Sequence, residues 1–396
     1  MKDKLLKIFL LVIKYLVYII ANIIPKKRNL WVFGAWFGKR YSDNPKAFFE
    51  FVNDEKKHIC AVWICKDEDV IKQVRNLGYK AYHEKSFRGI LYQLRAQFAF
   101  VCQSLQDDIY SPCIGKRTIV VNLWHGLPLK KIMYDVFGDK VVKKNNIGRL
   151  FDKFSPYNKI RNDYLLATSK ETQETLSKAF RISIERTLIT GFPRNDLLLG
   201  LHDKASNMPY KCLYMPTFRG GVGSECDLFE QYGFDAKEMD EKLVENNIEL
   251  VLRLHPVNKP TAFILDAIDR AKNIRFDYSP DLFDTLAEYD VVVTDYSGGY
   301  FDFLLTGRPI LFAPFDLEKY KQQERNLYYD YEAVTLKPYS INWSELTSNI
   351  IKVKNGKISA SYHSEYNSLK TLFHDDLGEH FSSYSENLYC KVEFLK

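Results

Sequence analysis

Histidine side chains follow two short apolar runs of this sequence, at points where buried strands would end. His125 stands in "NLWHGLPLKK" directly after the apolar "RTIVV", and His255 stands in "LRLHP" after "IELV". A neutral imidazole can take a proton from an attacking hydroxyl, and a protonated imidazole can neutralise a leaving phosphate. The two positions therefore indicate acid–base chemistry, although a single histidine beside a strand is more often a structural residue.

Arginines and a serine-glycine turn at other strand ends suit an anionic ligand. Guanidinium groups match phosphate oxygens, and the free N–H groups of a helix start bind anions. "TDYSGGYFDF" places Ser297, Gly298 and Gly299 where a helix should begin, although Asp295 and Ser297 could be ordinary helix caps. Together these groups predict a diphosphate site. The arginines concerned are Arg194, Arg219, Arg253 and Arg308.

Several common enzyme and metal signatures are missing from the sequence. It has no G-x-G-x-x-G after its first strand, no G-x-S-x-G elbow, no phosphate-binding P-loop and no H-E-x-x-H. The seven cysteines are scattered without a C-x-x-C pair, which argues for a reducing compartment and against structural zinc. The single D-x-D, Asp67-Glu68-Asp69, lies at an expected helix start, where acidic residues are ordinary. We expect neither a metal nor a cofactor.

Strand-like and helix-like segments alternate along the chain, which indicates parallel sheets covered by helices. A polar stretch at 200–211 interrupts the pattern and predicts a domain boundary. We expect two doubly wound, Rossmann-like α/β domains facing each other across a cleft, with ligands at the carboxyl ends of the strands. The expected parts are a membrane-associating helix with its basic flank at 1–28, a domain at 29–205 and a domain at 206–396. Strands are expected at 29–36, 58–65, 98–104, 118–124, 163–169, 248–256, 273–278, 290–297 and 309–315, and helices at 67–78, 86–97, 170–180, 236–247, 281–289 and 299–307.

The N-terminal apolar run at 5–24 is suited to a membrane, because at ~1.5 Å per residue a helix of this length extends about 30 Å. Lys7 and Lys14 are seven residues apart and share one helix face, which favours a helix lying in the membrane interface with "PKKR" on the lipid headgroups. A tilted single span and an uncleaved signal sequence are the alternatives. We therefore expect a peripheral protein on the cytoplasmic face of the membrane.

A basic segment between Lys130 and Arg161 holds nine Lys or Arg and three Asp residues, a net charge of +6 that equals the excess of the whole chain. Such a surface implies an anionic partner, either nucleic acid or a phospholipid face, unless it is a solvated helix face. No nucleic-acid module is readable in the sequence, so no nucleic-acid partner is expected.

Six ordered motifs over residues 120–335 resemble those of the CDP-glycerol glycerophosphotransferase family of teichoic acid and capsule synthesis. They are "WHGLPLKKI", "TGFPRND", "YMPTFR", "LRLHP", "VVVTDYSGGYFDFLLTGRPILFAPFDLEKY" and "RNLYYDY". The resemblance implies a GT-B-like fold with an acceptor-binding N-terminal domain and a C-terminal domain that binds the nucleotide donor. It also implies that a polyol phosphate, glycerol phosphate first among the candidates, passes from CDP to a hydroxyl of a membrane-linked acceptor, releasing CMP.

The resemblance also implies roles for individual residues. His125 matches the proposed base of the family, and His255 matches a histidine that binds the donor phosphates. Around the donor we expect Arg219, Arg253, Thr294, Asp295, Ser297, Gly298, Arg308, Asp316 and Glu318. On the acceptor or phosphate side we expect Lys130, Lys131, Arg194, Asn195 and Asp196.

Departures from the family pattern leave the donor open between glycerol and ribitol phosphate. Leu127 stands where the family has Thr, Gly298 replaces the second Ser of T-D-Y-S-S, and "YDYEAVTLKPYS" lacks the usual P-G-P. Two other functions compete with the phosphotransferase. One is a GT-B glycosyltransferase that uses a nucleotide sugar, and the other is a non-catalytic membrane-bound polyanion binder.

Overall fold

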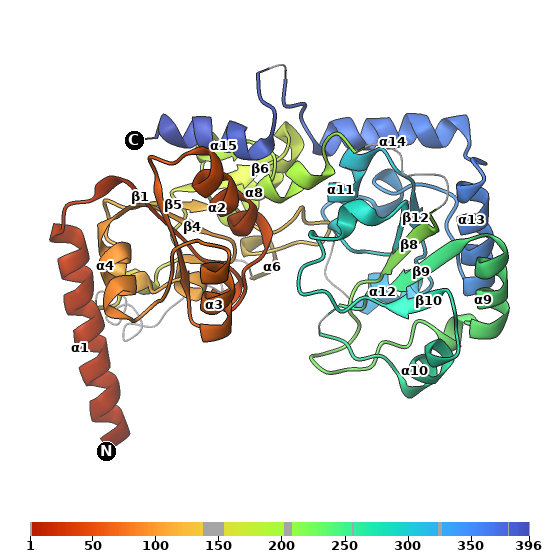
Figure 1. Ribbon diagram of the computed structural model, residues 1–396, viewed down its shortest axis with the longest axis horizontal. Helices are drawn as coiled ribbons and strands as arrows, with labels where there is room; N and C mark the ends of the chain where they lie inside the picture. Colours follow the sequence, from red (N-terminus) through yellow and green to blue (C-terminus); the bar gives the residue numbers. More distant parts are fainter. Residues whose placement is uncertain are drawn as a thin grey trace. The chain divides into compact units, whose positions relative to one another are not determined.

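The chain divides into two compact units in a computed structural model that describes residues 2–137, 154–201, 208–255, 257–323, 327–378 and 380–395 (Figure 1). The first unit comprises residues 1–125, 133–196 and 375–396, and the second comprises residues 126–132 and 197–374. Each unit is built around its own parallel sheet.

The first unit contains seven strands in the order β3-β2-β1-β4-β5-β6-β7 among its described residues, and all neighbours run parallel. Alternate residues of β1 face opposite sides, so Leu30 and Val32 join one apolar cluster while Trp31 and Phe33 pack on Phe100. The strands are β1 (Lys27–Phe33), β2 (Cys60–Cys65), β3 (Ala81–His83), β4 (Ala96–Val101), β5 (Ile119–Asn122), β6 (Tyr164–Ala167) and β7 (Thr187–Ile189).

Helices connect these strands, and serine or aspartate side chains cap several of their first turns. Ser86, Ser169 and Ser383 each accept a backbone N–H three residues on, which stabilises the helix start. The helices of this unit are α1 (Lys2–Ile23), α2 (Asp43–Glu55), α3 (Glu68–Asn76), α4 (Phe87–Arg95), α5 (Leu105–Asp108), α6 (Tyr134–Phe137), α8 (Lys170–Phe180) and α15 (Tyr384–Glu393).

The second unit contains five parallel strands in the order β10-β9-β8-β11-β12 among its described residues. Buried side chains such as Tyr214, Leu250, Val293 and Trp343 form its core. Its strands are β8 (Tyr210–Met215), β9 (Ile248–Leu252), β10 (Ile274–Phe276), β11 (Val291–Thr294) and β12 (Ile310–Phe312). Its helices are α9 (Ala236–Glu245), α10 (Ala262–Asp269), α11 (Gly299–Phe303), α12 (Leu317–Gln323), α13 (Trp343–Lys354) and α14 (Ala360–Phe373).

Both sheets reverse their strand order once, and such a reversal opens a crevice at the carboxyl ends of the two strands concerned. The reversal lies between β1 and β4 in the first unit and between β8 and β11 in the second. The predicted α/β fold class with parallel sheets is thereby confirmed.

Some expected boundaries differ from those in the structure. Residues 375–396 were expected in the second domain, but they belong to the first unit. There Asp375 N–H and the α15 residues Asn387 and Lys391 donate to backbone carbonyls at or just beyond the ends of β6 and β7. Residues 126–132 belong to the second unit. The expected helix at 281–289 is only a short 3₁₀ turn, Leu286–Glu288.

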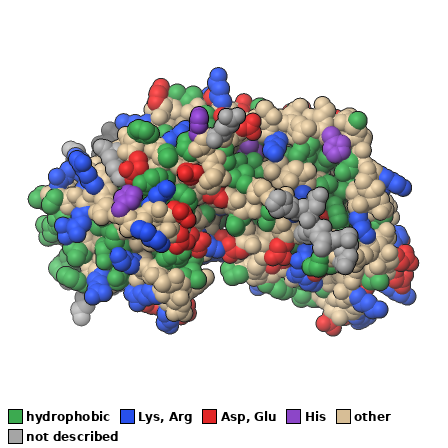
Figure 2. Space-filling view, turned by 45° about the horizontal axis from the view of Figure 1, so that its top comes forward, with side chains coloured by type: hydrophobic (Ala, Val, Ile, Leu, Met, Phe, Trp, Pro, Cys, Tyr) green, Lys and Arg blue, Asp and Glu red, His purple; other side chains and the backbone are tan. Residues whose placement is uncertain are grey.

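Helix α1 carries a row of exposed apolar side chains and is long and apolar enough to cross a membrane by length and composition. Its C-terminal end is fixed to the first unit. Arg117 donates to the carbonyls of Asn22, Ile23 and Ile24, and Lys26 donates to Ala21 and Leu94 carbonyls. Figure 2 shows hydrophobic side chains interspersed with Lys and Arg at the edge of the view where α1 lies.

Candidate active site

His125 lies just beyond β5, beside the crevice at the β1–β4 reversal. Its imidazole is half-buried and makes tilted ring contacts with Trp124, at 3.8 Å between ring centroids, and Trp36, at 5.4 Å. Trp36 follows β1, and Cys102 follows β4. The Nδ1 atom of His125 lies 3.0 Å from the carbonyl oxygen of Cys102. The fold therefore brings one predicted catalytic residue to the crevice where the topology favours a ligand.

The contact with Cys102 fixes the tautomer of the imidazole. A carbonyl oxygen can only accept, so Nδ1 of His125 carries the proton and donates it. In the neutral ring Nε2 is then an unprotonated acceptor, and no described residue bonds to it. Such an imidazole has the form required of a general base.

A buried ion pair supports the backbone of His125. Arg194 Nη1 lies 2.8 Å from Asp43 Oδ1 and donates to the carbonyl of His125 at 2.9 Å. The two side chains are 3% and 4% exposed. Asp43 also accepts from Trp36 Nε1 at 3.1 Å, and Asn44 Nδ2 donates to the Leu123 and Trp124 carbonyls. Arg194 is thus committed to protein partners near His125.

Burial lowers the pKa of His125 below its ordinary value of 6.5. The nearby Asp43 carboxylate and the Cys102 carbonyl act in the opposite direction, and Arg194 adds to the lowering. The net result is an imidazole that is neutral at pH 7 and available to accept a proton.

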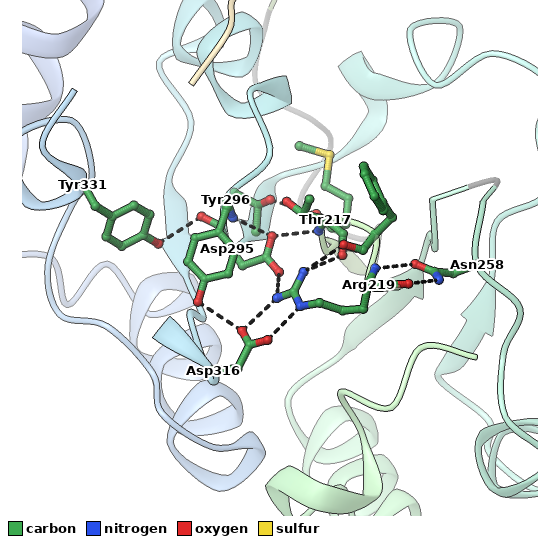
Figure 3. A network of polar contacts seen from close by, with 10 residues as sticks. Thr217, Arg219, Asn258, Asp295, Tyr296, Asp316 and Tyr331 are labelled. Carbon is green, nitrogen blue, oxygen red and sulfur yellow. Dashed lines mark hydrogen bonds and ion pairs between the residues drawn. The ribbon is translucent and has the colours of Figure 1, made fainter. Parts of the chain in front are cut away.

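The second unit assembles a different cluster at the reversal between β8 and β11, centred on Arg219 (Figure 3). Arg219 Nε and Nη2 bind Asp316 at 2.7 and 2.8 Å, and Nη2 also lies 2.7 Å from Asp295 Oδ2. Its Nη1 donates to the Thr217 and Phe218 carbonyls. We expected this guanidinium to bind donor phosphates, but all three of its nitrogens are occupied by protein oxygens.

Carboxylates of the same cluster join the ends of β8 and β11. Asp295 Oδ1 accepts from Thr217 N–H at 2.7 Å and from Tyr296 N–H at 2.5 Å. Tyr296 O–H donates to Asp316. Burial tends to raise the pKa of Asp316, but the Arg219 guanidinium holds that pKa below its ordinary value. Asp295 and Asp316 therefore shape the loops of this crevice, and Asp316 stays ionised.

Arg253 and Arg308 also have protein partners. Arg253 binds Asp277 and Ser279 beyond β10, and Arg308 donates to the carbonyls of Ala287 and Tyr289. The sequence suggested that both would contact phosphate. In the structure both hold neighbouring strand ends and turns, and their contact with phosphate stays a prediction.

His255 lies at the end of β9 and is exposed. Its Nδ1 accepts the backbone N–H of Val257 at 3.2 Å, so the proton of the neutral ring resides on Nε2. The imidazole lies 5.2 Å from the ring of Phe218. The Nδ1 atom of His255 is therefore an acceptor, whereas Nδ1 of His125 is a donor.

The remaining donor-side residues lie near the β8–β11 reversal. Thr294 donates its hydroxyl to the carbonyl of Met215, and Ser297 Oγ accepts from Gly299 N–H at 3.3 Å. Glu318 lies in the first turn of α12. A Cβ atom on Gly298 would overlap the carbonyl oxygen of Leu127, so the second unit holds residues 126–132 directly against this turn.

The residues expected on the acceptor side come from both units. Lys130 belongs to the second unit, with its ammonium 5.1 Å from the ring of Phe218 and 4.8 Å from that of Tyr320. Lys131 is half-buried in the same segment. Asn195 is buried, and Asp196 accepts from Tyr384 and Ser385 N–H at the start of α15. Much of the basic segment, 138–153, lies outside the described residues.

Sequence reasoning missed several residues around His125. Trp36, Asp43 and Asn44 come from segments about 80 residues away in the sequence. Asp108 accepts a hydrogen bond from the backbone N–H of Cys102. The signal in the sequence was the "SDNP" helix start at 42–45, which combines an N-cap with a proline in the first turn.

The described residues contain no group of three His, Cys, Asp or Glu side chains placed to hold a metal ion. Asp67 of the single D-x-D accepts from Asp69 and Val70 N–H and caps α3. This acidic triplet therefore acts as a helix cap in the first unit.

The family model for CDP-Glycerol:Poly(glycerophosphate) glycerophosphotransferase matches residues 16–376. The chain belongs to this family. A teichoic acid glycerol-phosphate transferase of Staphylococcus aureus (strain NCTC 8325 / PS 47) is 29% identical over 335 residues, covering 80% of this chain and 82% of that protein. A teichoic acid poly(glycerol phosphate) polymerase of Bacillus spizizenii (strain ATCC 23059 / NRRL B-14472 / W23) is 26% identical over 379 residues, covering 90% and 92%.

A solved structure of the wall teichoic acid polymerase TagF shares the fold, with a TM-score of 0.73 at 20% identity over 96% of this chain and 93% of that one. The family assignment confirms the predicted enzyme class, a glycerophosphotransferase of teichoic acid synthesis that uses a CDP-activated donor. The glycosyltransferase and polyanion-binder alternatives are set aside accordingly.

Proposed function

We propose that this transferase moves glycerol phosphate from CDP-glycerol to a hydroxyl of a lipid-linked acceptor, with His125 as the general base. Nε2 takes the proton as the acceptor oxygen attacks the phosphorus that carries glycerol. The new P–O bond forms, the bond to the bridging oxygen of the diphosphate breaks, and CMP leaves with that oxygen. The tautomer set by the Cys102 carbonyl is the observation that supports this role.

The donor phosphates are proposed to bind in the second unit beside His255 and the turn at 297–299. Two expected arginines, Arg219 and Arg253, are paired with carboxylates, so their charge is balanced before the donor arrives. A histidine, an ammonium and the amides of a helix start all suit phosphate oxygens, so we assign His255, Lys130 and the turn to the diphosphate. In this proposal the His255 ring donates a hydrogen bond to the donor phosphates, while His125 takes the acceptor proton.

The experiment measures acceptor-dependent CMP release from CDP-glycerol and, in parallel, CDP-ribitol. The unmodified protein is compared with His125→Ala, His255→Ala and His363→Ala, the last being an exposed histidine on α14 that serves as the matched control. A loss of about 10²–10⁴-fold in kcat is expected for His125→Ala, the range of general acid–base contributions. Unchanged release with His125→Ala would contradict the assignment, and the preferred donor identifies the polyol.

We further propose that α1 lies in the membrane interface on the cytoplasmic face and holds the enzyme over its lipid-linked acceptor. Exposed apolar residues such as Phe9, Val12 and Leu16 support this proposal, as does the fixed joint at Arg117. Its test is removal of residues 2–13, which spares Val17 and Ala21, both packed against the first unit.

The truncated protein should lose binding to vesicles with anionic lipid and turnover of a lipid-linked acceptor, while retaining turnover of a soluble acceptor analogue. Equal loss on both acceptors would show that the helix has a structural role instead. Protease protection of an N-terminal tag in sealed vesicles separates an interfacial helix from a span, because only a span places the tag across the bilayer.

A further inference from the structure

Asp108, the last residue of α5, is a fully buried carboxylate whose acceptor capacity is directed at the backbone around the His125 crevice. Its Oδ1 accepts the N–H of Phe37 at 2.9 Å. Its Oδ2 accepts the N–H groups of Cys102 at 2.8 Å and Gln103 at 2.7 Å. One side chain therefore ties the loop after β1 to the loop after β4.

Both tied segments contact the imidazole of His125. Cys102 donates its N–H to Asp108 and offers its carbonyl to His125 Nδ1, and the Gln103 N–H, which shares a peptide group with that carbonyl, also bonds to Asp108. The loop after β1 contains Trp36, whose ring lies against His125 and whose N–H bonds to Cys102 Sγ at 3.3 Å. Asp108 thus contacts the backbone next to two of the groups that surround the ring, the Cys102 carbonyl and the Trp36 side chain.

The loop that Asp108 holds has a conformation that needs external support. Trp36 and Phe37 adopt φ values of 46° and 62°, in the left-handed region that side-chain-bearing residues rarely occupy. Gly34 and Gly38 flank them, and a Cβ on Gly34 would approach the carbonyl oxygen of Asp108 to 2.6 Å. The Asp108 carboxylate and this close backbone approach together hold Trp36 against the imidazole.

We propose that Asp108 is a positioning residue for the transfer reaction, which holds the Cys102 carbonyl and the Trp36 loop so that His125 keeps its proton on Nδ1 and presents Nε2 to the acceptor hydroxyl. The proposal rests on the proposed role of His125 as base. It assigns to Asp108 an effect on kcat without contact with either substrate.

The test compares Asp108→Asn with Asp107→Asn, its neighbour on α5, whose carboxylate accepts from the Ser104 hydroxyl and not from the crevice backbone. The asparagine keeps the size of the side chain but turns an amide N–H₂ toward one of the backbone donors, so one tie is lost. We expect Asp108→Asn to lower kcat by about 10- to 100-fold, part of the general-base contribution, with KM for CDP-glycerol unchanged. Asp107→Asn should keep the wild-type kcat.

The spectroscopic readout is the ¹⁵N shift of the His125 ring at neutral pH, assigned with His125→Asn. The wild-type protein should show the Nδ1–H tautomer, and Asp108→Asn should show a mixture of tautomers. A kcat loss with an unchanged tautomer would overturn the proposal, and so would full activity of Asp108→Asn. The wild-type spectrum is informative even if the variant does not fold, because an Nε2–H tautomer in it would overturn the proposal directly.

Failure of the proposed function gives a different pattern. If His125→Ala keeps its activity, His125 is not the base, whereas the ring shifts still report whether Asp108 holds the imidazole. If His125→Ala is inactive and Asp108→Asn keeps both kcat and tautomer, the base assignment stands and the positioning role fails.

Discussion

The carbonyl oxygen of Leu127 packs so closely on Cα of Gly298 that a Cβ atom at position 298 would overlap it. These are two of the positions at which the chain departs from its family pattern, and the second unit places them in contact. The glycine is therefore required by the approach of the 126–132 segment.

Gly298→Ser tests this packing. The added Cβ meets backbone, which cannot rotate away, so we expect a loss of about 1–3 kcal/mol in the free energy of unfolding, as for other overpacked sites. Displacement of the 126–132 segment should also lower the rate of CMP release. Chemical unfolding and the transfer assay measure the two effects. Gly221→Ser is the control, because a Cβ there meets nothing closer than 4.0 Å; equal behaviour of both variants would contradict the argument.

Arg219→Ala is expected to act mainly on stability. The guanidinium is the shared partner of Asp295, 1% exposed, and Asp316, 7% exposed, so its removal takes the cation away from two buried carboxylates. Breaking such a pair costs about 3–5 kcal/mol. Arg270→Ala is the control, since its pair with Asp266 is exposed and should contribute under about 1 kcal/mol. A folded Arg219→Ala protein with normal stability and a raised KM for CDP-glycerol would instead indicate that Arg219 binds the donor phosphates.

Much of the fold follows from local sequence patterns. The run "CAVWIC" is apolar on both faces and forms β2, as a strand covered by helices on both sides should. The periodicity of 170–180, preceded by Ser169, gives α8 with its capping box. The segment at 281–289 has the composition of a helix, but Asp281 Oδ1 accepts the N–H of Phe283 and forms a tight turn in place of a first helical turn.

The partners of the site residues could not be predicted from the sequence. Arg194 and Asp43 are 151 positions apart, and Arg219 and Asp316 are 97 apart. A guanidinium aimed at a phosphate and one neutralised by a carboxylate have the same sequence signature. Only the structure shows which guanidinium already has carboxylate partners. The donor-side arginines were therefore expected without such partners.

The pH dependence of kcat/KM should reflect the neutral form of His125. Burial lowers the pKa of this group below the ordinary 6.5, so the base is deprotonated and active throughout the neutral range. Activity is expected to fall on acidification past this lowered pKa, and protonation of Asp108, whose pKa burial raises to about 7, should contribute to the fall. A rise of kcat/KM with pH above pH 7 that is absent in His125→Asn would contradict the lowered pKa of His125. CMP release measured across pH at constant ionic strength tests it, because salt changes would otherwise alter donor binding.

Asp196→Ala should detach the C-terminal helix rather than disturb acceptor binding. Asp196 accepts the N–H groups of Tyr384 at 2.7 Å and Ser385 at 3.2 Å, which have no intrahelical partners at the start of α15. We expect faster amide hydrogen exchange across 384–393 in the variant, with exchange in β8 and β11 unchanged. KM for a soluble acceptor should stay within a factor of about two of wild type.

The same carboxylate should give α15 a pH dependence of its own. Burial raises the pKa of Asp196 to about 6, against the lowering effect of its bonds to Ser385 and Tyr384. Between about pH 4 and 6 the folded protein therefore binds more protons at this site than the unfolded chain does, so this group's contribution to stability falls as pH rises through that range. Exchange at 384–393 should accelerate from about pH 4 to 6 beyond its intrinsic increase, and Asp196→Ala should remove that excess. A raised acceptor KM with unchanged exchange would instead return Asp196 to the acceptor site.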